Sequence, residues 1–297
     1  MGFVRRMRLG WDAPASRPLG LLGAGLLAAM VVAQVASGLR PEPIRLTSVV
    51  VVLLAASAVA FLADRRGPGR AAGAFAATVA IGYAAEWIGI RTGLPFGEYS
   101  YTSVLRPQAG GVPVIVAAAW GGMGLAAHAV ATAVAPENRV ARWAAGAAAL
   151  TAWDLFLDPQ MLRLGLWTWA DDGPYRGVPL SNFAGWLVVS VLVMMAIDLI
   201  VGREDAAVRS WRNGPSWSRS PSWRQGRSWR HGQSWRHGPS SESGPSRGLV
   251  TLYSVMAAME TLAFAAVFEP GDPLVAAAGG VAMGAFAVPA WRRAWRK

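Results

Sequence analysis

Eight apolar stretches alternate with short polar connections along the 297-residue chain. Each stretch is close to the roughly 17–25 residues that a helix needs to cross the hydrocarbon core of a bilayer. The pattern predicts an all-α fold, a polytopic membrane helix bundle of about eight transmembrane helices. The fifth and eighth stretches are marginal in length, which leaves a count of seven open. The stretches lie near residues 19–36, 46–63, 71–90, 112–135, 143–158, 183–201, 248–268 and 273–290.

The composition supports a membrane protein and narrows the chemistry. Hydrophobic residues make up 54% of the chain and charged residues only 15%, which is low for a soluble domain. Cysteine is absent, so the chain has no disulfide, no thiolate nucleophile and no cysteine metal ligand. Two of the three histidines, His231 and His237, lie in a polar insert. We therefore predict neither a metal site nor a cofactor.

Basic residues are distributed unevenly between the two sides that eight helices define. Most of the 28 lysine and arginine residues fall on the side that holds both chain ends. The positive-inside rule then predicts a cell-membrane protein with both termini in the cytoplasm. The net charge of +11 does not indicate nucleic acid, because the arginines flank apolar segments. The predicted units are a cytoplasmic segment at 1–18, helices one to six in 19–201, a loop at 202–247, helices seven and eight in 248–290, and a basic tail at 291–297.

A six-residue repeat fills the long polar loop. It begins with SWRNGP, and SWRHGP is its fifth copy, between residues 210 and 240. Arginine with tryptophan can bind RNA by charge and stacking, or rest on anionic lipid headgroups. The Ser, Gly, Pro and Arg composition cannot build a core, so we predict an expanded, disordered loop without chemistry.

The middle of the chain carries an internal duplication. An acid, an aromatic pair thirteen residues later, a GVP tripeptide and a tryptophan recur in the same order. Residues 86–120 hold the first copy and residues 154–186 the second. The first copy consists of Glu86, Tyr99, Tyr101, 111–113 and Trp120, and the second of Asp154, Trp167, Trp169, 177–179 and Trp186.

This duplication predicts two parallel helix hairpins, near 71–135 and 143–201. Parallel repeats are related by an axis along the membrane normal, and binding sites tend to lie at their interface. The alternative is that glycine, proline and belt aromatics gather at the ends of any membrane hairpin. That alternative explains each match singly, but not the shared register of all of them.

Three acids inside or beside apolar stretches are the candidate catalytic residues. Glu86 lies near the end of the third helix, and Asp154 has the equivalent place in the fifth. Asp158 follows Asp154 by four residues, which puts both on the same face of the helix. Pro159 predicts the end of that helix. Ionisable residues within a membrane span point to function, and a carboxyl group in an apolar pocket can donate a proton. As an alternative, Glu86 and Asp158 could be solvated or paired with Arg91 and Arg163.

Other polar residues rank lower. Glu260 lies in the middle of the seventh helix and is a second candidate for supplying a proton. Glu98 is also second in rank, because a loop position favours a solvated turn residue. His128 is expected to be a packed, hydrogen-bonded histidine, and Asp198 is expected to lie far from the other acids.

The predicted topology brings the three acids to the non-cytoplasmic end together with aromatic side chains, which stabilise cations. Acids and aromatic walls without metal or cysteine suit protonation of an alkene, with a second carboxylate orienting or deprotonating the attacking water. The candidate substrate-binding residues are Tyr99, Tyr101, Trp120, Trp167, Trp169, Asn182, Phe183 and Trp186.

Four strings in the middle of the chain are distinctive. They are EWIGIRTGLPFGEYSY (86–101), GVPVIVAAAW (111–120), WDLFLDP (153–159) and GVPLSNFAGW (177–186). Together they resemble a known family, the carotenoid-biosynthesis integral-membrane proteins, which includes bisanhydrobacterioruberin hydratase and the CruF-type carotenoid 1′,2′-hydratases. The resemblance implies addition of water to the terminal C1=C2 bond of an acyclic carotenoid, lycopene-like or C50, to give a tertiary alcohol.

Two other functions remain open at this point. Asp154 and Asp158 resemble part of the aspartate-rich motifs with which intramembrane prenyltransferases bind magnesium diphosphate, but a second motif is missing. Internal repeats and membrane-embedded acids also occur in transporters, so a non-catalytic carotenoid-binding or transport protein is the third reading. The expected partners are the carotenoid, water and membrane lipid, and the sequence predicts no particular oligomer.

Overall fold

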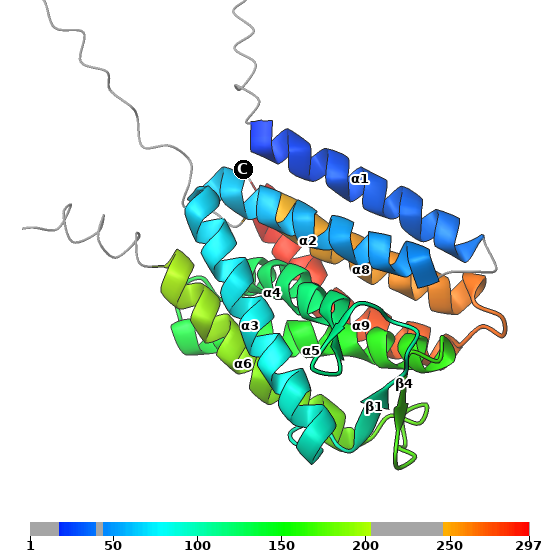
Figure 1. The fold of residues 1–297 in the computed structure, drawn as a ribbon. Coiled ribbons are helices and arrows are strands. Elements are labelled where there is room, and N and C mark those ends of the chain that lie inside the picture. Colours follow the sequence, from blue (N-terminus) through cyan, green and yellow to red (C-terminus); the bar gives the residue numbers. More distant parts are fainter. Residues whose placement is uncertain (1–17, 40–43, 203–245, 297) are drawn as a thin grey trace, which may run out of the picture.

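Helices form at all eight predicted apolar stretches. The computed structural model describes residues 18–39, 44–202 and 246–296, and these ranges contain eight α-helices and one π-helical turn (Figure 1). The prediction of an all-α membrane bundle is therefore confirmed. The helices are α1 (Pro18–Gly38), α2 (Ile44–Arg66), α3 (Pro68–Thr92), α4 (Val114–Val134), α5 (Arg139–Arg163), α6 (Leu180–Val201), α8 (Arg247–Leu262) and α9 (Pro273–Trp295), and the π-helical turn η1 (Ala263–Val267) extends α8.

Seven of the described helices are long and apolar enough to cross a membrane. The chain is thus a multi-pass membrane protein. Helix α5 is the exception, although it has 25 residues. Its polar residues include Asp154 and Asp158, both of which are buried, and it packs against α4, α6 and α9. Its polar face is therefore turned into the protein and away from lipid. The low mean hydropathy of α5 then carries no cost, because its buried acids do not contact hydrocarbon.

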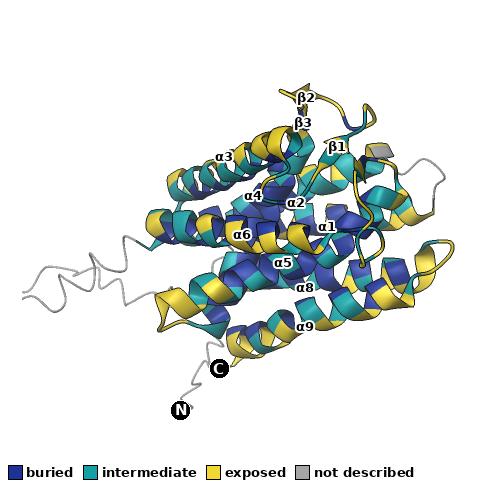
Figure 2. Ribbon diagram, turned by 90° about the horizontal axis from the view of Figure 1, so that it is seen from below, coloured by how far each residue is buried: buried dark blue, intermediate teal, exposed yellow. Residues whose placement is uncertain are grey.

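Helix α4 occupies the centre of the bundle (Figures 1 and 2). It packs against α2, α3, α5, α8 and α9, and small residues permit these close approaches. A side-chain carbon added at Gly122 would lie 3.0 Å from Leu54 of α2. One added at Gly124 would lie 2.8 Å from Thr78 of α3. The glycines of α4 thus bring neighbouring helices close to the centre.

Helix α5 continues past the proline that was predicted to end it. The prediction was wrong because Pro159 lies inside the helix, which ends at Arg163. A proline has no N–H, so the carbonyl four residues earlier loses its helical partner. Here that carbonyl belongs to Leu155, and it accepts a hydrogen bond of 2.9 Å from the Tyr175 hydroxyl. A side chain from the following loop therefore replaces the missing backbone donor.

Short strands connect the helices at the end of the bundle where α3 and α5 finish. Strands β1 (Tyr99–Tyr101) and β4 (Trp167–Trp169) form one antiparallel pair. Strands β2 (Gln108–Ala109) and β3 (Val112–Pro113) form another. The β2–β3 turn rests on α3, since the Tyr83 hydroxyl donates to the Ala109 carbonyl at 3.1 Å. The two strand pairs thus lie at one end of the bundle.

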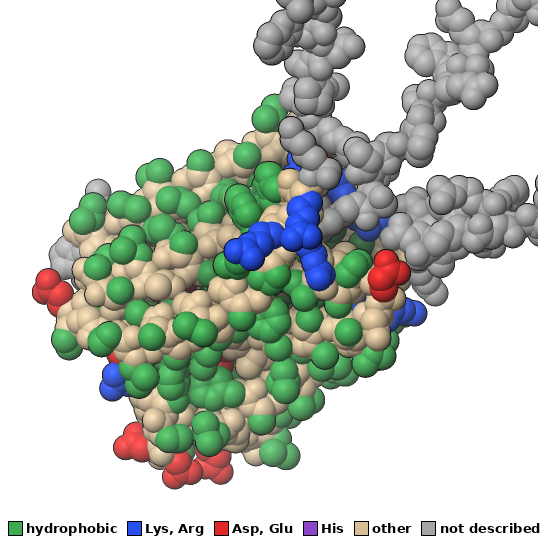
Figure 3. Space-filling model, turned by 180° about the vertical axis from the view of Figure 1, so that it is seen from behind, with side chains coloured by type: hydrophobic (Ala, Val, Ile, Leu, Met, Phe, Trp, Pro, Cys, Tyr) green, Lys and Arg blue, Asp and Glu red, His purple; other side chains and the backbone are tan. Residues whose placement is uncertain are grey.

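The surface agrees with a membrane location. Hydrophobic side chains cover much of the face in Figure 3, whereas most basic side chains gather toward one end and most acidic side chains toward the other. The orientation relative to the cytoplasm stays a prediction. The predicted segment at 1–18 and the hexapeptide-repeat loop at 202–247 lie almost entirely outside the described residues.

Candidate functional site

A cavity lies between the ends of α3 and α5 and the beginnings of α4 and α6. It contains about 690 Å³ of space not filled by atoms, which includes open solvent at its mouth. The structure brings most of the predicted site residues together in its wall. Those that line it are Glu86, Tyr99, Tyr101, Trp120, Asp158, Trp167, Trp169, Asn182 and Trp186.

Glu86 is held by three hydrogen-bond donors. Its side chain is 4% exposed. The hydroxyls of Tyr99 and Tyr101 donate to Oε2 at 2.5 and 2.7 Å. The Trp120 Nε1–H donates to Oε1 at 3.0 Å. Gly82, one turn earlier on α3, makes room for this indole, because a side-chain carbon there would lie 2.5 Å from it. Three donors on two oxygens offset part of the cost of burying a charge on Glu86.

Asp154 and Asp158 form a buried carboxyl pair. They lie one turn apart on α5 and are 0% and 2% exposed. The Asn182 Nδ2 donates to both, at 2.7 Å to Asp154 and also to Asp158. The Trp167 Nε1–H donates to Asp158 at 2.8 Å. Two carboxyl groups that share one donor lie so close that a negative charge on one disfavours a charge on the other, so the pair has the chemistry of a proton store.

The β1–β4 ladder sets the four aromatic residues around these acids. Tyr99 pairs with Trp169, and Tyr101 pairs with Trp167. Burial and the nearby Glu86 carboxylate raise the pKa of both tyrosines well above its ordinary value. The hydroxyl groups therefore keep their protons and remain donors. The ladder thus fixes hydrogen-bond donors and aromatic faces in one structure.

The pairing also bears on the predicted duplication. The sequence repeat aligns Tyr99 with Trp167, the first aromatic residue of each copy. In the ladder, however, the first aromatic residue of each copy pairs with the second aromatic residue of the other. A two-fold axis between Ser100 and Thr168, which face each other in the ladder, would produce this crosswise pairing. The internal repeat stays a prediction, with which these contacts agree.

Two stacked tryptophans form the inner wall of the cavity. The rings of Trp120 and Trp186 lie 3.9 Å apart. Trp153 of α5 meets Trp186 edge-on at 6.1 Å and also lines the cavity. The wall is therefore built from α4, α5 and α6 together.

Four candidate residues lie away from the cavity lining. Asp154 does not line the cavity, but it is joined to the lining residue Asp158 through the amide of Asn182. Glu98 is exposed in the loop before β1. Phe183 packs against Tyr175, with ring centroids 5.6 Å apart. Glu260 is 7% exposed within α8.

Neither of the ion pairs considered as alternatives forms. Arg91 donates to the carbonyls of Trp87 and Gly110, and Arg163 donates to the carbonyl of Pro270. The alternative that Glu86 and Asp158 are solvated at the membrane surface is also wrong, because both are buried. Folding of the connecting loops over the helix ends removes these acids from water.

Several lining residues escaped the sequence reasoning. Trp153 stands directly before Asp154 in one of the family-like strings, and that position was its only signal. Phe96 and Leu105 lie in loops, and Thr47 and Val51 lie on α2, outside the duplicated region. Apolar residues of a membrane helix carry no pattern that separates a cavity wall from a lipid-facing surface.

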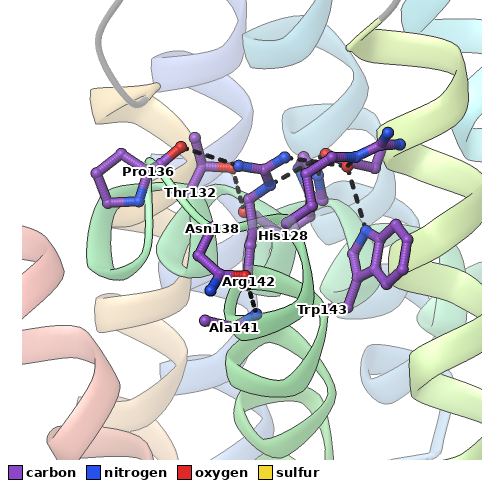
Figure 4. Close-up of polar contacts among 9 residues, drawn as sticks. His128, Thr132, Pro136, Asn138, Ala141, Arg142 and Trp143 are labelled. Atoms are coloured by element: carbon purple, nitrogen blue, oxygen red, sulfur yellow. Dashed lines mark hydrogen bonds and ion pairs between the residues drawn. The ribbon is translucent and has the colours of Figure 1, made fainter.

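A second polar cluster lies at the other end of the bundle (Figure 4). Its centre is Asp198 of α6, which is 6% exposed. As predicted, Asp198 is remote from the other acids, and His128 is packed and hydrogen-bonded. The groups that contact the Asp198 carboxylate are His128 at 3.3 Å, Arg139 at 3.2 Å, Arg142 at 3.1 and 3.0 Å, and Trp143 at 3.2 Å.

In the part of the chain that the structure describes, no three His, Asp or Glu side chains are arranged to hold an ion. Cofactor-free chemistry remains a prediction.

Comparison with known proteins places this chain in a family. A family model described as carotenoid biosynthesis protein matches residues 47–217. Bisanhydrobacterioruberin hydratase of Haloarcula japonica is 29% identical over 185 residues, which are 58% of this chain and 61% of that protein. The match thus spans about three fifths of the relative's length. No solved structure matches. Since the family model covers more than half of the chain, this protein belongs to the carotenoid biosynthesis protein family.

Proposed function

We propose that this protein adds water to the terminal C1=C2 double bond of an acyclic carotenoid end group and yields a tertiary alcohol. The main support is the meeting of Glu86 with the Asp154–Asp158 pair at one apolar, aromatic cavity. Family membership supports a carotenoid substrate, lycopene-like or C50, and the name of the relative supports hydration. The predicted orientation would place this cavity toward the non-cytoplasmic face.

The Asp154–Asp158 pair is the proposed proton donor. Asp158 lines the cavity and is joined to Asp154 through the amide of Asn182. A proton held by the pair passes to C2 of the alkene, whose π electrons form the new C–H bond. C1 is left as a tertiary cation, and the pair gains one negative charge. Asn182, which donates to both acids, stabilises that charge.

Aromatic faces and Glu86 complete the reaction in this proposal. The cation at C1 forms beside indole and phenol rings, whose faces attract positive charge. Water attacks C1, and the Glu86 carboxylate takes the proton that the water loses. The Trp169 Nε1–H is buried without a partner among the described residues and is available to hold that water. Return of the proton from Glu86 to the aspartate pair restores the site, so the net change is one added water.

Replacement of a single carboxyl group tests the proposal. We expect Asp154→Asn to reduce hydroxycarotenoid formation by about a hundredfold or more in a host that makes an acyclic carotenoid. Glu98→Gln is the matched control, because it removes an exposed acid outside the cavity, and it should retain activity. The measurement is the amount of product heavier by one water per amount of protein in the membrane. Undiminished product from Asp154→Asn would remove Asp154 from the mechanism.

A further inference from the structure

The cavity wall combines polar groups with apolar side chains. Its carboxyl and amide groups come from α3, α5 and α6. Five apolar residues of the lining make up what we call the apolar arm. The apolar arm comprises Val51 of α2, Leu105 of the loop before β2, Ile115 of α4, and Leu157 and Met161 of α5.

Several elements contribute to the apolar arm. Leu105 and Met161 belong to one buried cluster, and Ile115 and Leu157 pack against it. Helix α4 packs against both α2 and α5 and lies between them (Figure 1). Lining residues from these three helices therefore border the arm together.

The arm reaches a helix that faces lipid. Thr47 and Val51, one turn apart on α2, line the cavity and are half-buried. On the same helix, Val49 is 45% exposed and Val52 is 55% exposed. Since α2 is apolar enough to span the membrane, these exposed valines face hydrocarbon. The border of the cavity at Val51 thus adjoins the bilayer.

We propose that the apolar arm is a lateral passage, through which the polyene chain of the substrate extends from the carboxyl groups into the bilayer past Val51. This rests on the proposed function, because it assumes that the end group reacts at Glu86 and Asp158. Val51 is then a specificity-determining residue for long linear isoprenoids. It contacts the chain rather than the reacting carbons.

The chemistry of a carotenoid fits such a passage. Conjugated double bonds keep the chain stiff and nearly straight, so a bound end group requires an open path for the remainder. That path must be apolar, because an unpaired polar group beside hydrocarbon is costly. The arm meets this requirement, because all five of its residues are apolar. Thr47, one turn from Val51 on α2, adds a hydroxyl group to the lining beside it.

The absence of cysteine from the chain permits a direct test. Val51→Cys and Val52→Cys are small changes on adjacent positions, one in the arm and one on the lipid-facing side. Each full-length variant is treated in detergent with phenylmercuric acetate, a lipid-soluble thiol reagent, and mass spectrometry measures modification. We expect modified Val51→Cys to lose roughly tenfold or more of its conversion of lycopene. Modified Val52→Cys and treated wild type should change by less than about twofold.

Protection by bound lycopene separates the passage from the reaction. Lycopene should slow modification of the cysteine at position 51 and leave that at position 52 unchanged. Equal rates with and without lycopene at position 51, or full activity after stoichiometric modification there, would overturn the passage. If lycopene protects position 51 but wild type forms no product heavier by water, the passage stands and the hydratase proposal fails.

Ile115→Cys provides an independent check, because it enters the same arm from α4. The same protection and loss of activity are expected there. An arm that responds at position 51 but not at 115 contradicts a continuous passage.

Discussion

Trp120 stacks on Trp186 with ring centroids 3.9 Å apart and ring planes 14° from parallel. Trp120 also donates its Nε1–H to Glu86 at 3.0 Å. Contact between these indoles therefore ties the position of a carboxylate on α3 to the packing of α4 and α6. Both tryptophans hold the same place in the predicted repeat, but only Trp120 has a hydrogen bond to Glu86 among the described contacts.

Trp120→Phe separates these two contributions. The substitution keeps an aromatic ring in the stack and removes the donor to Glu86. A hydrogen bond to a charged group contributes about 1.5–3 kcal/mol, so we expect conversion to fall by roughly ten- to a hundredfold. Trp186→Phe is the matched control and should cost less, because it changes the stack without removing that bond. Equal losses in both variants would show that packing, rather than the hydrogen bond, sets the activity.

Asn182 is a single side chain that contacts two acids. Its amide nitrogen donates to Asp154 and Asp158, so Asn182→Ala leaves the pair without its common donor. We expect conversion to drop by about a hundredfold, the magnitude seen when a preorganised donor is removed. Ser181→Ala changes the neighbouring residue, whose hydroxyl donates to the Phe96 carbonyl at 2.9 Å, and should stay within about threefold of wild type. Product yields per folded protein decide between them.

The sequence was sufficient for the helices because membrane spans require long apolar runs. The predicted helix end at Pro159 was wrong. The loss of a backbone donor at a proline ends a helix only when no other group replaces that donor. Tyr175, sixteen residues later, replaces it. A tertiary contact of this kind has no local signal.

Most of the polar wall of the cavity was also predictable, because acids, tryptophans and tyrosines are rare in spans and recurred in register. The apolar wall was not. Val51 and Val52 are identical neighbours in one helix, yet the first lines the cavity and the second is exposed. Only the packing of α2 on α4 distinguishes them.

The tyrosines on Glu86 predict a decline of stability in alkaline solution. Burial and Glu86 raise the pKa of Tyr101 in the folded protein, whereas tyrosine in the unfolded chain ionises near about 10. The contribution of Tyr101 to the free energy of unfolding is therefore fully present below about pH 10. It is lost as the pH rises above that value, because the tyrosine then releases its proton only in the unfolded state. We expect Tyr101→Phe to reduce the slope of unfolding free energy by about 1.4 kcal/mol per pH unit above that pH. Denaturant titrations in detergent between about pH 10 and 11 measure this slope, and an unchanged slope contradicts the prediction.

Treatment with a chelator distinguishes the proposed hydration from magnesium-dependent prenyl transfer. Proton transfer by Asp154, Asp158 and Glu86 requires no cation, and no three acids or histidines in the described ranges form a metal site. We expect EDTA followed by dialysis to leave lycopene conversion within about twofold of the untreated protein. Loss of activity on chelation, with recovery on added magnesium, would favour the aspartate-rich prenyltransferase reading instead.

The Asp198 cluster is predicted to maintain the fold and not the reaction. Asp198 lies sixteen residues from Asn182 on α6, about 24 Å at 1.5 Å per residue, so its loss should not alter the cavity directly. Asp198→Asn leaves Arg142, whose side chain is 13% exposed, without a full counter-charge. Breaking a buried ion pair costs about 3–5 kcal/mol, so we expect a clear fall in melting temperature with unchanged conversion per folded molecule.

Arg139→Gln is the milder comparison, because Arg139 is 58% exposed and its pairing is weakened by solvent. Thermal melts and product yields from the same preparations test both statements, and a loss of specific activity in folded Asp198→Asn would place this cluster in the reaction after all.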